Sequence, residues 1–519
     1  MFNQQDLVQI AGKGIHLQVI QKQIECFIKG FPFIRLVRPA VAGDGIIRFE
    51  DSQLNFYTEY FDDKLPELKI VKFVPASGAA SRMFKHLFEF REKFTPTDDG
   101  MALFLSDQSF NSVYHFITHI KQIAFYNDLA ARVANSGGTL DQLLENRDFV
   151  SLVDYILTDK GLNYAQLPKA VLKFHQYPDG SRTAAEEHLV ESAAYGRDRS
   201  NIVRIHFTIS PEHQDKFTEL FATVTSLYES VFEVKFEISF SVQKSSTDII
   251  AVDETNQPVR NTDGSLLFRP GGHGALLENL NEIDADLIFI KNIDNIVPDH
   301  LKNTTFLYKK LIGGYLLFLK EAVSGFLVKL KGKQISPEKI DEIRIFACEK
   351  LFQDIPDEFK ALPHQDQVIY LFKLLNRPIR VCGMVKNEGE PGGGPFWVRE
   401  EDQRLTLQIV ESSQIELTDK EQKTIGDQST HFNPVDLVCC TRDFEGNSFN
   451  LTDFVNENTG FISLKSSGGK MMKAQELPGL WNGAMANWIT IFIEVPIITF
   501  NPVKTVNDLL RKEHLPPQY

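Results

Sequence analysis

The fold class is decided by one stretch of sequence, Leu68-Lys69-Ile70-Val71-Lys72-Phe73-Val74-Pro75 followed directly by Ala76-Ser77-Gly78-Ala79-Ala80-Ser81-Arg82. Its first half is a short, largely apolar and β-branched run, which is typical of a buried strand. Small residues follow, and a helical pattern begins at Arg82. The stretch therefore predicts a strand, a tight loop and a helix.

This loop has two interpretations. Small side chains let the backbone approach a phosphate closely, and the N–H groups that open the next helix point at the anion. Arg82 stands in the first helical turn, where the helix dipole disfavours a cation unless the cation faces a bound polyphosphate. The other interpretation, about equally good on this segment alone, is an ordinary strand-to-helix turn. The candidate nucleotide-binding residues of the loop are Ala76, Ser77, Gly78, Ala79, Ala80 and Ser81.

Strand and helix patterns alternate along the rest of the chain. Helical spacing occurs first at Leu17, Ile20, Ile24 and Ile28, and it dominates residues 86–166 and 300–375. Short strand patterns occur at residues 203–209, 232–240 and 287–290. From Ile379 onward we expect strands and Gly-rich turns. This alternation predicts an α/β sheet with helical additions.

Length and charge narrow the classes of function. The chain has 519 residues and a mass of 59.0 kDa, which exceeds the roughly 250–300 residues of an ordinary single core. Hydrophobic residues make up 43% and charged residues 24%, as in a globular protein. The net charge is 55 − 69 = −14, which argues against binding to a nucleic-acid backbone. Any phosphate must be a small ligand that is gripped locally.

The sequence predicts a cytoplasmic protein without a membrane span. The first residues, from Phe2 to Asp6, lack the basic start and apolar run of a signal peptide. The apolar run at 316–328 contains Lys320 and Glu321, so we read it as an amphipathic helix. The five cysteines are scattered without metal or redox spacing, which favours reduced thiols.

Three further segments combine small or polar residues with strand or helix ends. Lys169 follows Pro168 and precedes an apolar run. Gly272-His273-Gly274 opens a helical pattern and could form a second cradle of backbone N–H groups. Asp294 comes just after the apolar run at 287–290, and carboxylates at the carboxyl ends of strands are where α/β sheets hold ligands and Mg²⁺. Taken singly, each segment also has a purely structural interpretation. Lys169 could be a solvated lysine, Gly272–Gly274 a Gly-rich turn, and Asp294 a capping residue.

Two segments near the end of the chain complete the set. A Gly-rich polar loop spans 383–397, and its Asn387 and Glu388 suit hydrogen bonds to sugar hydroxyls. For this loop alone, a solvated surface loop is the better interpretation. Further on, Pro502-Val503-Lys504 leads into a helical pattern.

Taken in order, these segments resemble the UDP-sugar pyrophosphorylases and the wider nucleotidyltransferases of GT-A-like fold. The loop that ends in Arg82 resembles the family's Gly-rich signature, and Pro168-Lys169 resembles its Pro-Lys step. The Gly-His-Gly and Asn-Ile-Asp-Asn segments, with their spacing, resemble UDP-glucose pyrophosphorylases, as does the C-terminal Pro-Val-Lys motif. The whole chain more closely resembles a bacterial family described as a domain of unknown function within this superfamily.

The resemblance implies a GT-A-like, Rossmann-like core with a mixed, mostly parallel sheet. It implies that a sugar 1-phosphate and a nucleoside triphosphate are joined with release of pyrophosphate, with Mg²⁺ as cofactor. Arg82, Lys169 and Lys504 would be the catalytic cations and Asp294 the metal ligand. The loop 76–81, Gln243 and Gly272–Gly274 would bind the nucleotide. Sugar-side contacts would come from Asn387, Glu388 and Glu411.

The chain also departs from the family pattern, which keeps two alternatives open. Ala80 stands where the family usually has Gly, and a methyl group there could crowd a phosphate. A helical insertion of about eighty residues separates the loop from Lys169, far longer than the usual link. These departures favour a non-catalytic protein that binds a nucleotide or sugar phosphate. A glycosyltransferase of similar fold is the other alternative, although no Asp-x-Asp follows the 287–290 run.

The predicted organisation is one catalytic unit with additions. Residues 1–68 form an N-terminal helical extension. Residues 69–378 form the nucleotidyltransferase-like core, with helical insertions at about 86–166 and 300–375. Residues 379–519 form a β-rich, sugar-side part of the same unit. The sequence carries no signal for an oligomeric state.

Overall fold

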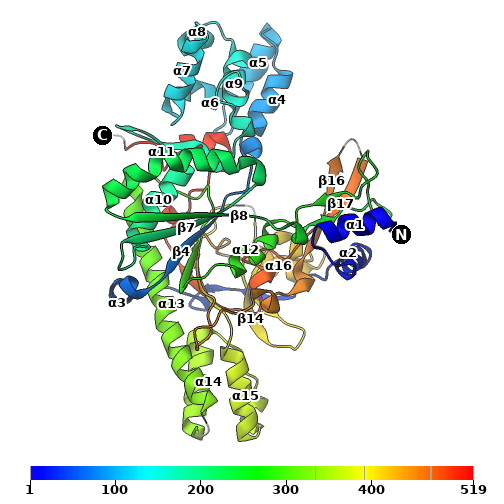
Figure 1. The fold of residues 1–519 in the computed structure, drawn as a ribbon, viewed down its shortest axis with the longest axis vertical. Coiled ribbons are helices and arrows are strands. Elements are labelled where there is room, and N and C mark those ends of the chain that lie inside the picture. Colours follow the sequence, from blue (N-terminus) through cyan, green and yellow to red (C-terminus); the bar gives the residue numbers. More distant parts are fainter. Residues whose placement is uncertain (1, 333–334, 391, 468–469, 518–519) are drawn as a thin grey trace. The chain divides into compact units, whose positions relative to one another are not determined.

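A computed structural model describes residues 2–332, 335–390, 392–467 and 470–517 of the chain. The fold is α/β and divides into two compact units, each built from three stretches of chain. The first unit contains Met1–Val71, Gln243–Phe289 and Lys310–Val495, and the second contains Lys72–Val242, Ile290–Lys309 and Pro496–Tyr519. Strands and helices of both units are labelled in Figure 1.

The sheet of the second unit has the strand order β4-β7-β8. These strands are β4 (Ile70–Pro75), β7 (Ile202–Ile209) and β8 (Lys235–Val242). β7 and β8 are parallel and in continuous register. The crossover between them is α11 (Gln214–Phe232), which packs on both α10 (Ala184–Tyr195) and β8. A hairpin of β5 (Lys173–Tyr177) and β6 (Gly180–Thr183) precedes α10.

A helical insertion fills the chain between β4 and β5, and its helices gather together in Figure 1. They are α4 (Lys85–Lys93), α5 (Asp98–Ser106), α6 (Val113–Thr118), α7 (Tyr126–Asn135), α8 (Leu140–Glu145) and α9 (Phe149–Leu157). Their apolar side chains belong to the same buried cluster as Val74, Phe207 and Val503. The insertion therefore shares the core of the second unit.

The first unit contributes a mixed sheet with the order β2-β3-β18-β12-β15-β11. These strands are β2 (Val41–Ala42), β3 (Gly45–Ile47), β18 (Ile489–Glu494), β12 (Ile379–Met384), β15 (Asp436–Cys440) and β11 (Leu287–Ile290). β12 is parallel to β18, and β18 is parallel to β3, whereas β12 and β15 are antiparallel. β12, β15 and β11 are buried along their whole length.

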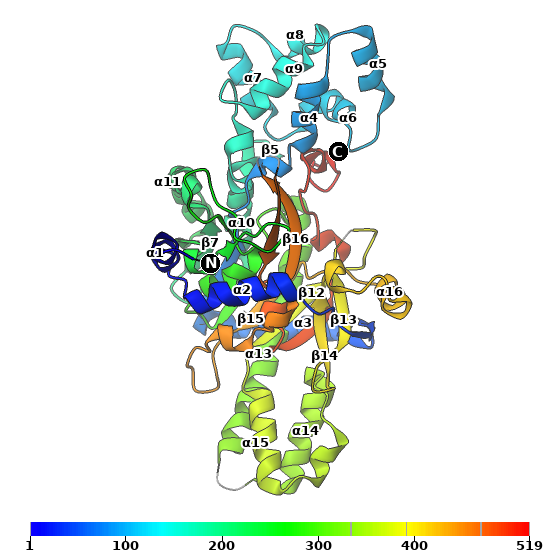
Figure 2. The same cartoon turned by 90° about the vertical axis from the view of Figure 1, so that its right-hand side faces the viewer.

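Smaller sheets and helices surround this sheet within the first unit. The further strands are β1 (Leu36–Pro39), β13 (Gly394–Arg399) and β14 (Leu405–Val410) in one sheet, the pair β9 (Ile249–Ile250) and β10 (Phe268–Arg269), and the hairpin of β16 (Phe461–Ser467) and β17 (Lys470–Glu476). The helices are α1 (Gln4–Gly12), α2 (Leu17–Lys29), α3 (Asp51–Lys64), α12 (Leu277–Asn281), α14 (Pro337–Leu351), α15 (His364–Leu375) and α16 (Lys420–Asp427). Figure 2 shows α14 and α15 side by side.

One long helix, α13 (Lys302–Lys331), runs from one unit into the other. Within the described part of the chain, the helical stretch Asp299–Lys331 is the one segment long and apolar enough to cross a membrane by length and composition. Half of its apolar window is buried inside the protein, and the core helix of a soluble protein meets the same criterion. All five cysteines are free.

The predicted α/β fold with a mixed, mostly parallel sheet and helical insertions is confirmed. The run at 287–290 is the strand β11, and the helical pattern at 86–166 becomes α4 to α9. Two details differ from the sequence reading. Phe232 ends α11 and Glu233 adopts a left-handed conformation, so β8 begins later than predicted. Ile28 is 64% exposed, and Phe27 takes the buried position on α2.

Candidate functional site

The small-residue loop after β4 is fastened to the segment around Pro168 within the second unit. The Ala80 N–H donates to the Leu167 carbonyl at 3.1 Å, and the Lys169 N–H donates to the Gly78 carbonyl at 3.4 Å. Gly78 and Ala79 are exposed, whereas the Ala80 side chain is fully buried. The loop therefore presents the backbone around Gly78 and Ala79 to solvent, next to Lys169.

Lys169 joins two further predicted segments. Its Nζ lies 2.7 Å from Asp294 Oδ2 and 2.8 Å from the Val503 carbonyl oxygen. The Lys169 and Asp294 side chains are 14% and 20% exposed, so the ion pair is accessible but sheltered. The Val503 N–H returns a hydrogen bond to the Asp294 carbonyl at 3.1 Å. We call Lys169, Asp294 and the backbone at Gly78 and Val503 the Lys169 cluster.

The two other predicted cations border this cluster. Arg82 ends a short 3-10 turn (Ala80–Arg82) and is exposed. Lys504 is exposed as well, and its N–H donates to Asp508 Oδ2 at 2.9 Å. The next turn is tied to the loop side, because the Val506 N–H donates to the Met83 carbonyl at 3.1 Å. Four of the predicted phosphate and metal motifs thus lie in the second unit, whereas the Gly-His-Gly segment lies in the first.

A buried ionic network supports the segment that carries Asp294, and sequence reasoning missed it. Glu191 on α10 lies 3.3 Å from Lys72 Nζ and 3.0 Å from Lys291 Nζ, and all three side chains are 1% exposed. Burial lowers the pKa of Lys72 to about 7. Burial alone would raise the pKa of Glu191, but the lysine charges hold it well below its usual range. The available signal was a lysine inside one buried strand pattern and a second lysine directly after another.

The same helix α10 also contacts the Asp294 segment directly. His188 Nε2 lies 3.1 Å from the Ile293 carbonyl oxygen. Burial holds the pKa of His188 well below its usual range, so the imidazole is neutral and donates this hydrogen bond. The backbone beside Asp294 is therefore positioned from the protein interior.

The first unit contains the predicted Gly-His-Gly segment. Gly272 has φ +76°, a conformation that favours glycine, and a Cβ on Gly274 would lie 2.0 Å from the Pro478 carbonyl oxygen. Both glycines are therefore required by the local backbone. The His273 ring stacks obliquely on Trp481, with centroids 4.9 Å apart, and burial lowers the pKa of His273.

Glu411 lies at the centre of a second polar cluster in this unit. Its Oε1 accepts hydrogen bonds from Asn433 Nδ2 and Asn482 Nδ2, both at 3.0 Å. Gly479 brings His273 close to Asn482, since an added Cβ would lie 2.7 Å from His273 Nε2 and 3.5 Å from Asn482 Cγ. We call Glu411, Asn433, Asn482 and His273 the Glu411 cluster.

The Glu411 cluster keeps unused hydrogen-bonding capacity. The buried atoms Asn433 Oδ1, Asn482 Oδ1 and His273 Nε2 have no hydrogen-bond partner among the residues that the structure describes. Buried polar atoms are usually paired, so such a group is suited to a ligand that supplies several hydroxyls. Asn433 and Asn482 were not predicted, because a lone asparagine carries no local sequence pattern.

The side-chain hydrogen bonds of Gln243 and Asn387 stay within their own segments. Gln243 Nε2 donates to Thr247 Oγ1 at 3.3 Å, and the Thr247 carbonyl borders Gly271. Asn387 Oδ1 accepts from the N–H groups of Gly389 and Glu390, which makes a turn within its own loop. Glu388 is exposed on that loop. Pro391 of the same loop lies outside the described residues.

The metal prediction rests on a single carboxylate. Across the described ranges, no group of three or more His, Cys, Asp or Glu side chains could hold a metal ion. Mg²⁺ does not need such a group, because it is often held by one or two carboxylates together with phosphate oxygens and water. Asp294, accessible and beside Lys169, fits that pattern.

Solved structures similar to this chain are sugar-nucleotide enzymes. A uridine diphosphate N-acetylglucosamine pyrophosphorylase from Trypanosoma brucei, in complex with inhibitor, is 12% identical with a TM-score of 0.46, over 95% of this chain and 74% of that one. A UDP-glucose pyrophosphorylase from Leishmania major is 11% identical with a TM-score of 0.43, over 97% and 77%.

Sequence comparisons gave one family. A family model described as "Domain of unknown function (DUF4301)" matches residues 3–515. No curated protein matches the sequence significantly.

Proposed function

The chain belongs to that family of domains of unknown function, and we propose that it is a nucleotidyltransferase that joins a sugar 1-phosphate to a nucleoside triphosphate with release of pyrophosphate. The proposal rests on the side chains and backbone groups of the two polar clusters.

The observation that carries the proposal is the meeting of four distant segments at Lys169. Its Nζ bonds Asp294, which is 125 positions away, and the Val503 carbonyl, which is 334 positions away, while its N–H bonds the Gly78 carbonyl. A lysine, a carboxylate and an exposed loop of small residues are the groups that phosphoryl transfer uses. Chance sequence similarity at four short motifs would not require the motifs to be neighbours in space.

In the proposed reaction, a phosphate oxygen of the sugar phosphate attacks the α-phosphorus in line, and pyrophosphate leaves. The protein has little covalent chemistry to do, so positioning and charge neutralisation supply the rate enhancement. The amides of Gly78 and Ala79 would hold the triphosphate, and Arg82 would stabilise the leaving pyrophosphate. Lys169 and Lys504 would neutralise the α-phosphoryl group and the sugar phosphate.

Asp294 would hold Mg²⁺, which neutralises charge on the phosphates when it is bound. Asp294 and Lys169 are already fixed relative to each other by the Val503 backbone, so their positions are set before a ligand arrives. Such preorganisation is what makes charged groups effective in stabilising a transition state.

The Glu411 cluster would bind the sugar. Its unpaired carbonyl oxygens accept hydrogen bonds, and a sugar hydroxyl can both donate to them and accept from a neighbouring N–H. Gln243 and Gly272–Gly274 remain predictions for the nucleotide, and Asn387 and Glu388 remain predictions for the sugar.

One observation favours the second candidate, a protein that binds these ligands without turnover. The Ala80 N–H is occupied by the Leu167 carbonyl, so this part of the loop offers the phosphates fewer free donors than a fully open cradle would. A binder needs only affinity, whereas catalysis needs donors aimed at the transition state.

The test is pyrophosphate release from a panel of nucleoside triphosphates and sugar 1-phosphates with Mg²⁺. We expect pyrophosphate release to be faster with one nucleoside triphosphate and one sugar 1-phosphate than with the others. Saturable binding without release would favour the binder. Release of nucleotide from a finished nucleotide sugar, seen only with an acceptor, would favour a glycosyltransferase.

A further inference from the structure

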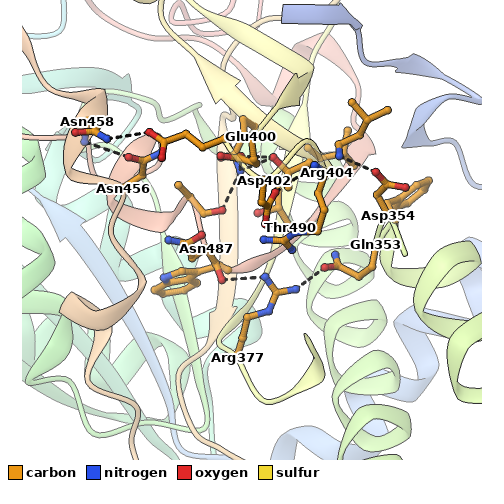
Figure 3. Close-up of a pocket in the computed structure, with 18 residues that line it drawn as sticks. Gln353, Asp354, Arg377, Glu400, Asp402, Arg404, Asn456, Asn458, Asn487 and Thr490 are labelled. Carbon is orange, nitrogen blue, oxygen red and sulfur yellow. Dashed lines mark hydrogen bonds and ion pairs between the residues drawn. The ribbon is translucent and has the colours of Figure 1, made fainter. Parts of the chain in front are cut away.

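The first unit contains a polar pocket of about 300 Å³ at the beginning of β12, β14 and β18. Figure 3 shows Gln353 and Asp354 on one side, Asn456 and Asn458 on the other, and Arg377 between them. The pocket is distinct from the Glu411 cluster, because none of the four residues of that cluster lines it.

Arg377 carries a charge that no carboxylate neutralises. Its guanidinium donates to the carbonyl oxygens of Leu374 and Asn487 and to the Gln353 amide oxygen, and it forms no ion pair with any residue that the structure describes. Burial, and then the charge of Arg404, lower the pKa of Arg377 to about 10. Arg377 remains protonated at neutral pH, and an anion beside it would relieve its unfavourable environment.

The surroundings of Arg377 add further groups that favour an anion. Arg404, which is paired with Asp402 at 2.6 Å, lines the same pocket. Trp488 lines it too, and its buried Nε1 has no acceptor among the residues described. A neighbouring cavity of about 580 Å³ shares Arg377 and Arg404 and is also lined by Lys373. The pocket lining thus presents two guanidinium groups and an indole N–H, alongside the carboxylates of Asp354, Glu400, Glu401 and Asp402.

The same lining also presents hydrogen-bond acceptors and amides. Glu400 accepts from Thr406 Oγ1 at 2.5 Å and from Gln408 Nε2 at 3.4 Å. Glu401 accepts from Asn458 Nδ2 at 3.3 Å. Paired carboxylates and amides of this kind bind hydroxyl groups, which donate and accept at once.

We propose that this pocket, named the Arg377 pocket, binds a small hydroxylated metabolite that carries a phosphate or carboxylate group. The anionic group lies against Arg377, Arg404 and Trp488 Nε1. The hydroxyl groups lie against Glu400, Glu401 and Asn458. The Arg377 pocket is a further ligand site of the first unit, separate from the Glu411 cluster.

The test measures binding to the full chain in which Lys169 and Glu411 are both replaced by Ala, so that the proposed reaction site contributes little. The probes are glucose 6-phosphate, gluconate and glucose, titrated by calorimetry. Arg377→Met and Arg404→Met remove each guanidinium and keep an apolar stem. Arg344→Met is the matched control, because Arg344 lies on α14 outside the pocket lining, is 21% exposed and pairs with Asp341.

We expect glucose 6-phosphate and gluconate to bind more tightly than glucose. Each pocket variant should lower the affinity for both anions by about tenfold or more, because each loses a charged hydrogen bond. Arg344→Met should leave both affinities unchanged. Circular dichroism identifies a variant that fails to fold, in which case the other variant decides. The proposal is wrong if no probe binds, if glucose binds as well as the anions, or if folded pocket variants bind like their parent. If the unmutated chain releases no pyrophosphate from any substrate pair, the proposed reaction is overturned, but the proposed Arg377 pocket is not.

Discussion

A lysine that bridges distant segments is the residue on which the polar cluster of the second unit depends. Lys169 contacts the loop after β4, the Asp294 segment and the Val503 carbonyl. The residues around it are therefore held by backbone as well as by side-chain bonds. A change in one charged side chain should alter chemistry more than it alters folding.

Replacing Asp294 or Lys504 by Ala should lower turnover by at least about 100-fold, because in the proposed reaction each removes a charge beside the reacting phosphates. Pyrophosphate release under saturating substrates measures the effect. Asp128→Ala and Lys512→Ala are matched controls, since Asp128 pairs with Lys173 elsewhere in the second unit and Lys512 is 91% exposed. Near-normal turnover in both Asp294→Ala and Lys504→Ala would contradict the assignment.

The buried Lys72 should make stability depend on pH. Its pKa is about 7 in the fold and 10.5 as the ordinary value, so between these pH values the unfolded chain binds more protons. The free energy of unfolding should therefore rise with pH across this window, by up to about 1.4 kcal/mol per pH unit. Urea unfolding at pH 7, 8 and 9 measures the slope.

Lys72→Met should remove that slope, because Met has no proton to bind in either the folded or the unfolded state. Lys69→Met is the control, since Lys69 precedes the same strand but is 43% exposed beside Asp284. An unchanged slope in Lys72→Met would show that another group is responsible.

At the scale of elements, the two loops of small residues differ in what their glycines do. A Cβ on Gly274 would lie 2.0 Å from the Pro478 carbonyl oxygen, whereas a Cβ on Gly78 would have nothing within 4 Å. The first loop is shaped by packing against its own unit. The second has open space at its glycine, which leaves room for a ligand.

Gly274→Ala should therefore lower the free energy of unfolding by about 1–3 kcal/mol, and Gly78→Ala should change it by less than about 0.5 kcal/mol. Calorimetric melting of the two variants measures both. Gly78→Ala should still lower turnover, because its methyl group would meet an approaching phosphate. Equal melting temperatures for both variants would refute the packing argument.

Elements whose pattern is local could be predicted from the sequence, and elements made by distant pairing could not. Leu287–Ile290 was predicted because an apolar run of this length is typical of a buried strand and too short for a helix. The strands β1, β2 and β3 have two to four residues each, too few for a period, and β1 exists through pairing with β13. The extension predicted as helical thus also contributes strands to the first unit.

The same distinction applies to the sites. Lys169 and Asp294 stand beside recognisable strand and turn signals. Asn482 gains its place by bonding Glu411 across 71 positions, which no local pattern records. Arg377 likewise looks like an ordinary cation just after α15 in the sequence. The structure shows that its hydrogen-bond partners are two carbonyl oxygens and an amide oxygen, with no carboxylate among them.

At the scale of the whole molecule, the final stretch of the second unit closes several distant contacts. Asn507 Nδ2 donates to the carbonyl oxygens of Phe110 and Ser112, at 2.6 and 3.0 Å. His514 Nδ1 lies 2.9 Å from His175 Nε2, with both rings buried. The stretch is thus part of the core rather than an appendage.

Deleting residues 506–519 should loosen the second unit selectively. Amide hydrogen exchange in α6 and β5 should become faster by about tenfold or more, whereas exchange in β12 of the first unit should change little. Deleting only residues 516–519 is the control. Equal loosening of β12 would show that the two units do not respond separately.

The division of each unit into three stretches of chain has a consequence for biosynthesis. During translation, all residues of the first unit have been synthesised once Val495 is added. The second unit still needs Pro496–Tyr519. Val503 and the neighbouring Lys504 therefore leave the ribosome after Gly78, Lys169 and Asp294. A nascent chain interrupted shortly before them would still lack the groups that complete that cluster, so premature termination there should yield an incompletely assembled product.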